Sequence, residues 1–158
     1  MAQAANLADR VSRLETIEAI KQLKARYCAY CDDNYDPEGI GSLFVEDGIW
    51  DGERFGRYVG REQIKAFFRS ISGEIVFAAH LVLNPIVEVQ DAEHATGKWR
   101  LIMPATFRSG GKNEARWLVA AYDDSFVRVK GTWMFKTLRV HVNFLEPHQG
   151  TWASSAVL

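Results

Sequence analysis

Three polar side chains lie among apolar residues and are of types that carry out acid–base chemistry. Tyr27 lies on an apolar helical stripe, Asp32 follows five residues later, and His80 interrupts the apolar run 77–83. A histidine that removes a proton from carbon needs the correct tautomer and help in carrying positive charge, and a carboxylate supplies both. A tyrosine hydroxyl can donate toward a developing enolate or a departing hydroxide.

Each of these residues also has a purely structural interpretation. Asp32 can be a solvated acid beside Asp33, or part of a turn before Asp36. His80 can be a core or interface histidine whose hydrogen bonds are satisfied. The sequence pattern alone leaves both interpretations open.

The elements that must position these residues follow from the periodicity of the apolar side chains. Between residues 7 and 30 apolar residues recur in steps of three and four, which predicts an amphipathic helix with a break near Leu14. Residues 36–38 (Asp-Pro-Glu) predict the start of a short helix that runs to residue 44. A short strand is predicted at 49–50, and a third helix after Gly60.

Long β runs separated by polar turns follow Gly73. They cover residues 76–89, 95–107, 114–129 and 132–145, and the last two are joined by Lys130-Gly131, a two-residue hairpin signal. Helices followed by a meander of long strands predict an α+β fold. We expect a cone-shaped half-barrel, in which a long, curved antiparallel or mixed sheet wraps around about three N-terminal helices.

Composition and charge exclude several classes of function. The 158 residues, 47% of them hydrophobic and 25% charged, are typical of a single globular domain, here residues 1–158. With 19 basic and 20 acidic side chains, we expect neither a nucleic-acid partner nor a membrane partner. Residues 1–13 lack the apolar core of a secretion signal, so we expect a cytoplasmic protein.

The two cysteines give no indication of a cofactor. Cys28 and Cys31 form a C-x-x-C pattern within the predicted first helix, and the sequence contains no second pair. A structural zinc ion needs four ligands, and a redox pair is typical of a helix N-terminus. We therefore expect no metal and no cofactor, and the common phosphate-binding and dinucleotide-binding motifs are absent from the sequence.

Several motifs together resemble the SnoaL-like branch of the nuclear transport factor 2-like superfamily. They are Arg26-Tyr27, Asp32, Asp36, Leu43-Phe44, Asp47 with Trp50, Tyr58-Val59-Gly60-Arg61-Glu62, His80, Gly97-Lys98-Trp99-Arg100, Tyr122-Asp123-Asp124-Ser125-Phe126 and Gly131-Thr132-Trp133-Met134-Phe135-Lys136. The resemblance extends from about Leu14 to Asn143 and implies a cystatin-like cone. It implies no particular substrate, because this fold carries many functions.

Within that superfamily the motifs are most similar to bile-acid 7α-dehydratases and hexachlorocyclohexane dehydrochlorinases, and more distantly to scytalone dehydratases. In the first two groups a helix-borne aspartate pairs with a strand-borne histidine, which implies that Asp32 pairs with His80. The bile-acid dehydratases also carry a tyrosine five residues before the aspartate, as Tyr27 stands here. The implied catalytic residues are therefore His80, Asp32 and Tyr27, and the tyrosine favours an oxygen-bearing substrate.

Further polar residues lie on the later predicted strands. Arg139, His141 and Asn143 share one face of the last strand. That face is either solvated or, as the resemblance implies, points into the cone, where Arg139 could bind an anionic group. The same alternatives hold for Arg100. The expected substrate-binding residues are Arg139, His141, Asn143, Trp50, Tyr58 and Arg100.

The resemblance implies a cofactor-independent lyase or isomerase, of dehydratase or cyclase type, that removes a carbon-bound proton from a hydrophobic polycyclic or polyketide-like ligand. Two alternatives stay open: a non-catalytic small-molecule-binding protein, and a scaffold subunit akin to the β-subunit of a ring-hydroxylating dioxygenase. We further expect a homodimer or homotrimer. The apolar tail 146–158, which contains Trp152, is expected to dock on its own cone or on a neighbouring copy.

Overall fold

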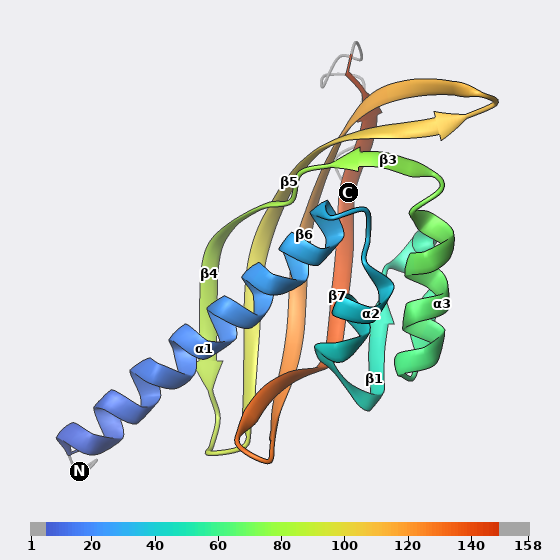
Figure 1. The fold of residues 1–158 in the computed structure, drawn as a ribbon. Helices are drawn as coiled ribbons and strands as arrows, with labels where there is room; N and C mark the ends of the chain where they lie inside the picture. The colour runs from blue at the N-terminus through green and yellow to red at the C-terminus, as the bar shows by residue number, and fades with distance from the viewer. Residues whose placement is uncertain (1–5, 149–158) are drawn as a thin grey trace.

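The computed structural model describes residues 6–148, which contain three helices (Figure 1). Helix α1 spans Leu7–Asp32, α2 spans Pro37–Ser42 and α3 spans Arg61–Ile71. Asn6 caps α1 by accepting a hydrogen bond from the backbone of Asp9, and Asp36 caps α2 in the same way. The first helix runs through Leu14 without the break that its length had suggested. No helix in this part of the chain is long and apolar enough to cross a membrane.

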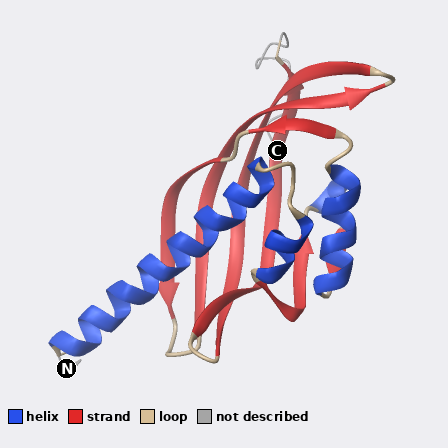
Figure 2. Ribbon diagram, in the orientation of Figure 1, coloured by secondary structure: helices blue, strands red, loops and turns tan. Residues whose placement is uncertain are grey.

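Seven strands form one mixed sheet, which lies behind the helices in Figure 2. The strands are β1 (Phe44–Asp51), β2 (Arg57–Val59), β3 (Ile75–Ala78), β4 (Leu81–Val89), β5 (His94–Ser109), β6 (Lys112–Val129) and β7 (Thr132–Pro147), with a short 3-10 helix η1 (Glu53–Phe55) between β1 and β2. The order is β2-β1-β7-β6-β5-β3, and β4 also pairs with β5. Among the described strands, β1 and β7 are the one parallel pair.

The predicted hairpin at Lys130-Gly131 is confirmed. Val129 pairs with Thr132, and both turn residues have positive φ, 49° and 83°. This is the conformation that a two-residue hairpin requires. The tight turn joins two long strands in the middle of the sheet.

All three helices lie against one face of the curved sheet, and the hydrophobic core fills the space between (Figure 1). Side chains alternate along each strand, so that in β5 Trp99, Leu101 and Met103 are buried while Arg100 is exposed. The predicted α+β cone is therefore confirmed, with helices inside the curve of the sheet. Most of the expected docking tail, residues 149–158, lies outside the described residues.

Candidate active site

His80 lies where the strand pairing with β5 is interrupted. β3 pairs with residues 105–107 of β5 and β4 with residues 95–102, so Ala79 and His80 lie between the two ladders. The carbonyl of Pro104 accepts a hydrogen bond of 3.1 Å from the backbone of Ala79. Because proline has no N–H to donate in return, regular pairing stops there. The single strand predicted over residues 76–89 is therefore two strands. Since the N–H of Ala79 faces β5, that of the next residue, His80, faces away from β5 toward another partner.

That partner is Asp32, the last residue of α1. The backbone N–H of His80 donates to both carboxylate oxygens of Asp32, at 3.0 and 3.1 Å, and the ring Nδ1 lies 2.7 Å from Oδ1. Because a carboxylate accepts hydrogen bonds, Nδ1–H is the donor and the lone pair is on Nε2. The His80 side chain is 6% exposed and that of Asp32 37%, so the pair reaches from the interior to the surface.

The turn after α1 holds a tyrosine ring against His80. Asn34 and Tyr35 both have positive φ, 52° and 54°, a conformation that is strained for a bulky residue and that often accompanies functional sites. The Tyr35 backbone N–H donates to the carbonyl of Cys31 at 3.1 Å. Its ring meets that of His80 edge-on, with 6.0 Å between centroids. Asp32 and Tyr35 thus position the imidazole from two sides.

Tyr27 lies in the core with its hydroxyl beside Trp50. The indole N–H of Trp50 donates to the Tyr27 oxygen at 3.0 Å. A Cβ atom at residue 52 would lie 2.3 Å from the Trp50 ring, so Gly52 leaves the space that the indole needs. Because indole can only donate, the Tyr27 hydroxyl keeps its own proton to donate, and the Cys31 thiol, a weak acceptor, lies within hydrogen-bonding reach. Burial raises the pKa of Tyr27 well above its usual range, which keeps that proton in place.

Tyr27, Tyr35, Trp50 and His80 all line one cavity between the helices and the sheet. The rest of its wall is apolar and includes Phe55, Phe67, Phe68, Leu101, Phe107 and Leu118. The cavity volume is about 50 Å³, room for a few water molecules. A ligand with rings therefore needs side chains at the mouth to move aside.

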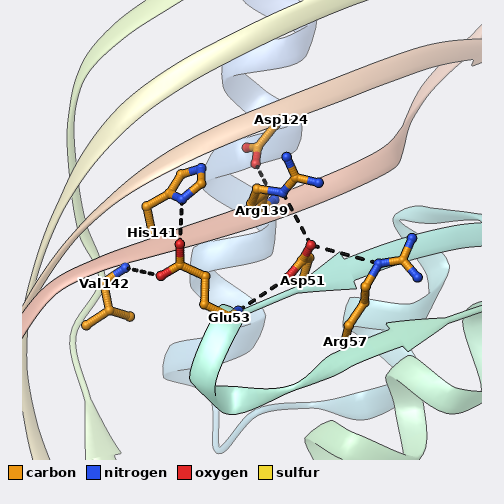
Figure 3. A network of polar contacts seen from close by, with 7 residues as sticks. All are labelled: Asp51, Glu53, Arg57, Asp124, Arg139, His141 and Val142. Atoms are coloured by element: carbon orange, nitrogen blue, oxygen red, sulfur yellow. Dashed lines mark hydrogen bonds and ion pairs between the residues drawn. The ribbon is translucent and has the colours of Figure 1, made fainter.

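Arg139 and His141 do not point into this cavity, in contrast to one of the two alternatives drawn from the sequence. Val140, between them, lines the cavity, so its neighbours lie on the other face of β7. Figure 3 shows both side chains on the face of the sheet turned away from α1. Arg139 Nε lies 3.3 Å from Asp51 Oδ2, and His141 Nδ1 lies 2.8 Å from Glu53 Oε1. They bind β1 and η1 to β7.

Three further expected substrate-binding residues also lie away from the cavity lining. Arg100 is exposed on the outer face of β5. The ring of Tyr58 stacks on that of Phe67 at 4.3 Å, behind the wall, and its hydroxyl donates to the carbonyl of Phe55. Asn143 lies at a bulge between β6 and β7, and its buried Oδ1 has no hydrogen-bond partner among residues 6–148. Of the expected binding residues, Trp50 alone lines the cavity within the described chain.

The structure adds a buried ion pair that the sequence reading missed. Lys24 Nζ lies 2.8 Å from Asp124 Oδ2, and each residue is 1% exposed. Burial raises the pKa of Asp124 to about 6, although Lys24 acts in the opposite direction. A signal was present, because Lys24 follows Ile20 by four residues and precedes Tyr27 by three, on the buried stripe of α1.

Comparisons with known proteins agree with this architecture. A family model described as "SnoaL-like domain" matches residues 12–139. The solved structure of a type 2 hexachlorocyclohexane dehydrochlorinase (LinA) has a TM-score of 0.82 and 22% identity, covering 90% of this chain and 95% of that one. A putative scytalone dehydratase from Novosphingobium aromaticivorans has a TM-score of 0.78 and 21% identity, covering 90% and 93%.

A third solved structure is described as an NTF2-like protein with a cystatin-like fold, also from Novosphingobium aromaticivorans. Its TM-score is 0.70 at 26% identity, and the match covers 98% of this chain and 96% of that one. No curated protein matches the sequence significantly. The comparisons thus agree on the fold.

Proposed function

Because this chain belongs to the SnoaL-like domain family, we propose that it is a cofactor-independent lyase or isomerase in which His80 is the general base. Structural neighbours that are dehydrochlorinases or dehydratases by description support a lyase-type or isomerase-type activity. One observation carries the proposal: His80 Nδ1 lies 2.7 Å from Asp32 Oδ1, and the same His80 side chain lines an apolar cavity.

In this mechanism His80 removes a proton from a carbon atom next to a carbonyl group. Nε2 takes the proton, because Nδ1–H is already donated to Asp32, and the carboxylate stabilises the imidazolium that forms. The C–H electron pair moves into an enolate whose oxygen receives a hydrogen bond from Tyr27. The enolate then either expels a β-substituent, which gives a lyase, or is reprotonated at another carbon, which gives an isomerase.

The apolar wall favours a hydrophobic substrate. Phe55, Phe67, Phe68 and Phe107 all line the cavity, and an aromatic wall suits flat conjugated or polycyclic molecules. Since the cavity is small, the substrate range depends on how far the mouth opens. We propose a single-ring or polycyclic β-hydroxy ketone, of the kind found among polyketides, as the starting substrate class.

The test is to screen β-hydroxy ketones of one to four rings for enone formation by ultraviolet absorbance. Exchange of the carbon-bound proton in heavy water, followed by NMR, detects proton removal even where no group leaves. We expect His80→Gln to lower turnover by about 10³-fold or more, and Tyr27→Phe by about 10²-fold. Tyr30→Phe, on α1 but away from the cavity lining, is the matched control and keeps full activity.

A binding protein would behave differently in the same assays. It would retain ligands in the cavity but catalyse neither exchange nor elimination, and His80→Ala would leave affinity unchanged. Turnover by the wild-type protein that persists in His80→Gln would contradict the assignment of His80 as the base.

A further inference from the structure

The cavity wall contains hydroxyl groups but no permanently charged side chain. None of its lining residues within the described chain is a lysine, arginine, aspartate or glutamate. Besides His80 and the indole of Trp50, the lining residues with polar side-chain atoms are Tyr27, Tyr35 and Tyr122. The hydroxyls of Tyr35 and Tyr122 have no hydrogen-bond partner among residues 6–148. Neither hydroxyl oxygen is fully enclosed, since Asn143 Oδ1 is the only buried unpaired polar side-chain atom among these residues, and a hydroxyl that faces open space in the cavity can donate to a ligand acceptor there.

Tyr122 differs from the other two because a cation lies against its ring. The ammonium of Lys24 is 3.1 Å from the ring centroid of Tyr122, and 5.2 Å from that of Tyr27. Asp124, two residues along the same face of β6, holds the ammonium at 2.8 Å. The ion pair therefore fixes the position of the Tyr122 ring through a contact with the ring face. A cation at the ring face also draws electron density from the phenol.

Burial keeps Tyr122 a hydrogen-bond donor. It raises the pKa of the phenol well above its usual range, as it does for Tyr27. Both hydroxyls thus keep their protons over the whole working range of pH. Trp50 fills the acceptor role of Tyr27, and the Tyr27 proton has the Cys31 thiol, a weak acceptor, in reach. A stronger acceptor on a ligand can therefore take a hydrogen bond from Tyr27 as well as from Tyr122.

We propose that Tyr122 is a second hydrogen-bond donor to the substrate oxygen, that Lys24 is a positioning residue at its ring face, and that the substrate is an uncharged carbonyl compound. The inference rests on the proposed function. When His80 Nε2 takes the proton, the C–H bond breaks and its electron pair forms the enolate double bond. The carbonyl π pair passes to oxygen, where Tyr27 and Tyr122 donate to the anion. When the carbonyl re-forms, the electron pair of the enolate C=C bond either expels the β-hydroxyl group, which leaves as water with the proton that His80 holds, or takes up that proton at another carbon.

Binding of an enolate mimic tests this without any turnover. The probe is 4-nitrophenolate at alkaline pH, with 4-nitrotoluene as the uncharged match that has a methyl group in place of the oxygen. By calorimetry we expect Tyr122→Phe to weaken 4-nitrophenolate binding about tenfold or more, because a hydrogen bond to a charged oxygen is lost. In Tyr122→Phe the affinity for 4-nitrotoluene should change less than about twofold. The control Tyr30→Phe should leave the affinities for both probes unchanged.

A double substitution tests the role of Lys24. Lys24→Met combined with Asp124→Leu removes both charges together and leaves no unpaired ion in the core. We expect 4-nitrophenolate affinity to fall about threefold to tenfold while 4-nitrotoluene affinity stays constant. A purely structural role would move both affinities alike, which would remove Lys24 from the proposal.

The outcomes separate this inference from the proposed function. Unchanged 4-nitrophenolate affinity in Tyr122→Phe overturns the inference, even where His80→Gln has abolished turnover. The inference is equally overturned if wild-type protein binds 4-nitrotoluene but not the phenolate. If wild-type protein binds neither 4-nitrophenolate nor 4-nitrotoluene, the cavity is enlarged by Leu118→Ala. The effect of Tyr122→Phe on the affinity for both probes is then measured in the Leu118→Ala protein.

Discussion

Asp32 stands at a position that electrostatics of the helix alone disfavours. It is the last residue of α1, a helix with no basic residue in its final turn, and the C-terminal end of a helix dipole repels negative charge. The compensation comes from His80, which donates to it from both backbone and ring. An acidic residue that is kept at an unfavourable helix end because it makes one specific contact is typical of a functional site.

That contact also has a consequence for stability. Asp32→Ala removes the acceptors of the His80 N–H groups, and we expect a loss of about 1–3 kcal/mol in the free energy of unfolding by urea. Amide exchange at His80 should accelerate as well. Asp33→Ala, which removes a neighbouring exposed acid, should stay within about 0.5 kcal/mol of wild type. Equal losses in both variants would contradict the structural role of the pair.

The buried pair of Lys24 and Asp124 should respond non-additively to substitution. Lys24→Met alone leaves a carboxylate without a counter-ion in the core, and we expect a loss of about 3–5 kcal/mol. Combining it with Asp124→Leu should recover most of that loss, because apolar side chains replace both charges. Urea unfolding of the single and double variants measures the difference. A double variant less stable than the single one would mean that the pair stabilises the fold beyond mutual neutralisation.

Asp124 should also give the protein a pH-dependent stability. Its pKa is raised by burial to about 6 in the folded protein, above the usual value of about 3.9. Between these values the folded state holds a proton that the unfolded state has released, so the contribution to stability is complete below about pH 4 and is lost as pH rises through 6. Subtracting the unfolding free energies of the Lys24→Met/Asp124→Leu variant isolates this slope. A difference in unfolding free energy that does not change between pH 4 and 6 would show that Lys24 keeps the Asp124 carboxylate ionised over this range.

Among the elements, those with strong local signals were predicted well. The caps of α2, the third helix, the Lys130-Gly131 hairpin and the long strands follow from spacing and turn residues. The interruption at His80 could not be predicted in this way, because it depends on Pro104, a residue on a different strand whose register is set by the whole sheet. The same limit explains why the direction of Arg139 and His141 stayed open, since alternation separates two faces without telling which one is inside.

The contact between Glu53 of η1 and His141 of β7 holds η1 to the sheet. Glu53 accepts from His141 Nδ1 at 2.8 Å and from the backbone of Val142 at 3.2 Å (Figure 3), and the His141 bond lowers the pKa of Glu53. We expect Glu53→Ala to raise hydrogen exchange about tenfold over residues 52–57, including Phe55 at the cavity wall. Glu46→Ala, an exposed acid on β1, is the control. Unchanged exchange in Glu53→Ala would mean that other contacts hold η1.

At the scale of the whole molecule, apolar side chains remain uncovered along one edge of the sheet. On β4, Leu81, Leu83 and Ile86 are 51%, 43% and 60% exposed, and the first half of α1 extends past this edge (Figure 1). Contiguous exposed apolar surface is typical of an interface. We propose that β4 contributes to a contact with a second copy of the chain.

The expected assembly is a homodimer or homotrimer, measured by light scattering on a sizing column. Leu83→Lys combined with Ile86→Lys should shift it to the monomer, because two charges would be buried at the contact. Lys98→Glu, on the solvent side of β5, is the control for a change of charge alone. A monomeric wild-type protein would contradict the proposal.

The small volume of the cavity also has a kinetic consequence. If a ring-sized ligand enters only when the mouth is open, the measured affinity is the intrinsic affinity multiplied by the open fraction of molecules. The association rate would then level off at high ligand concentration, at the rate of opening. Substitutions that favour the open population would speed uptake without changing any contact made by the bound ligand. Slow uptake and tight binding can therefore coexist in this fold.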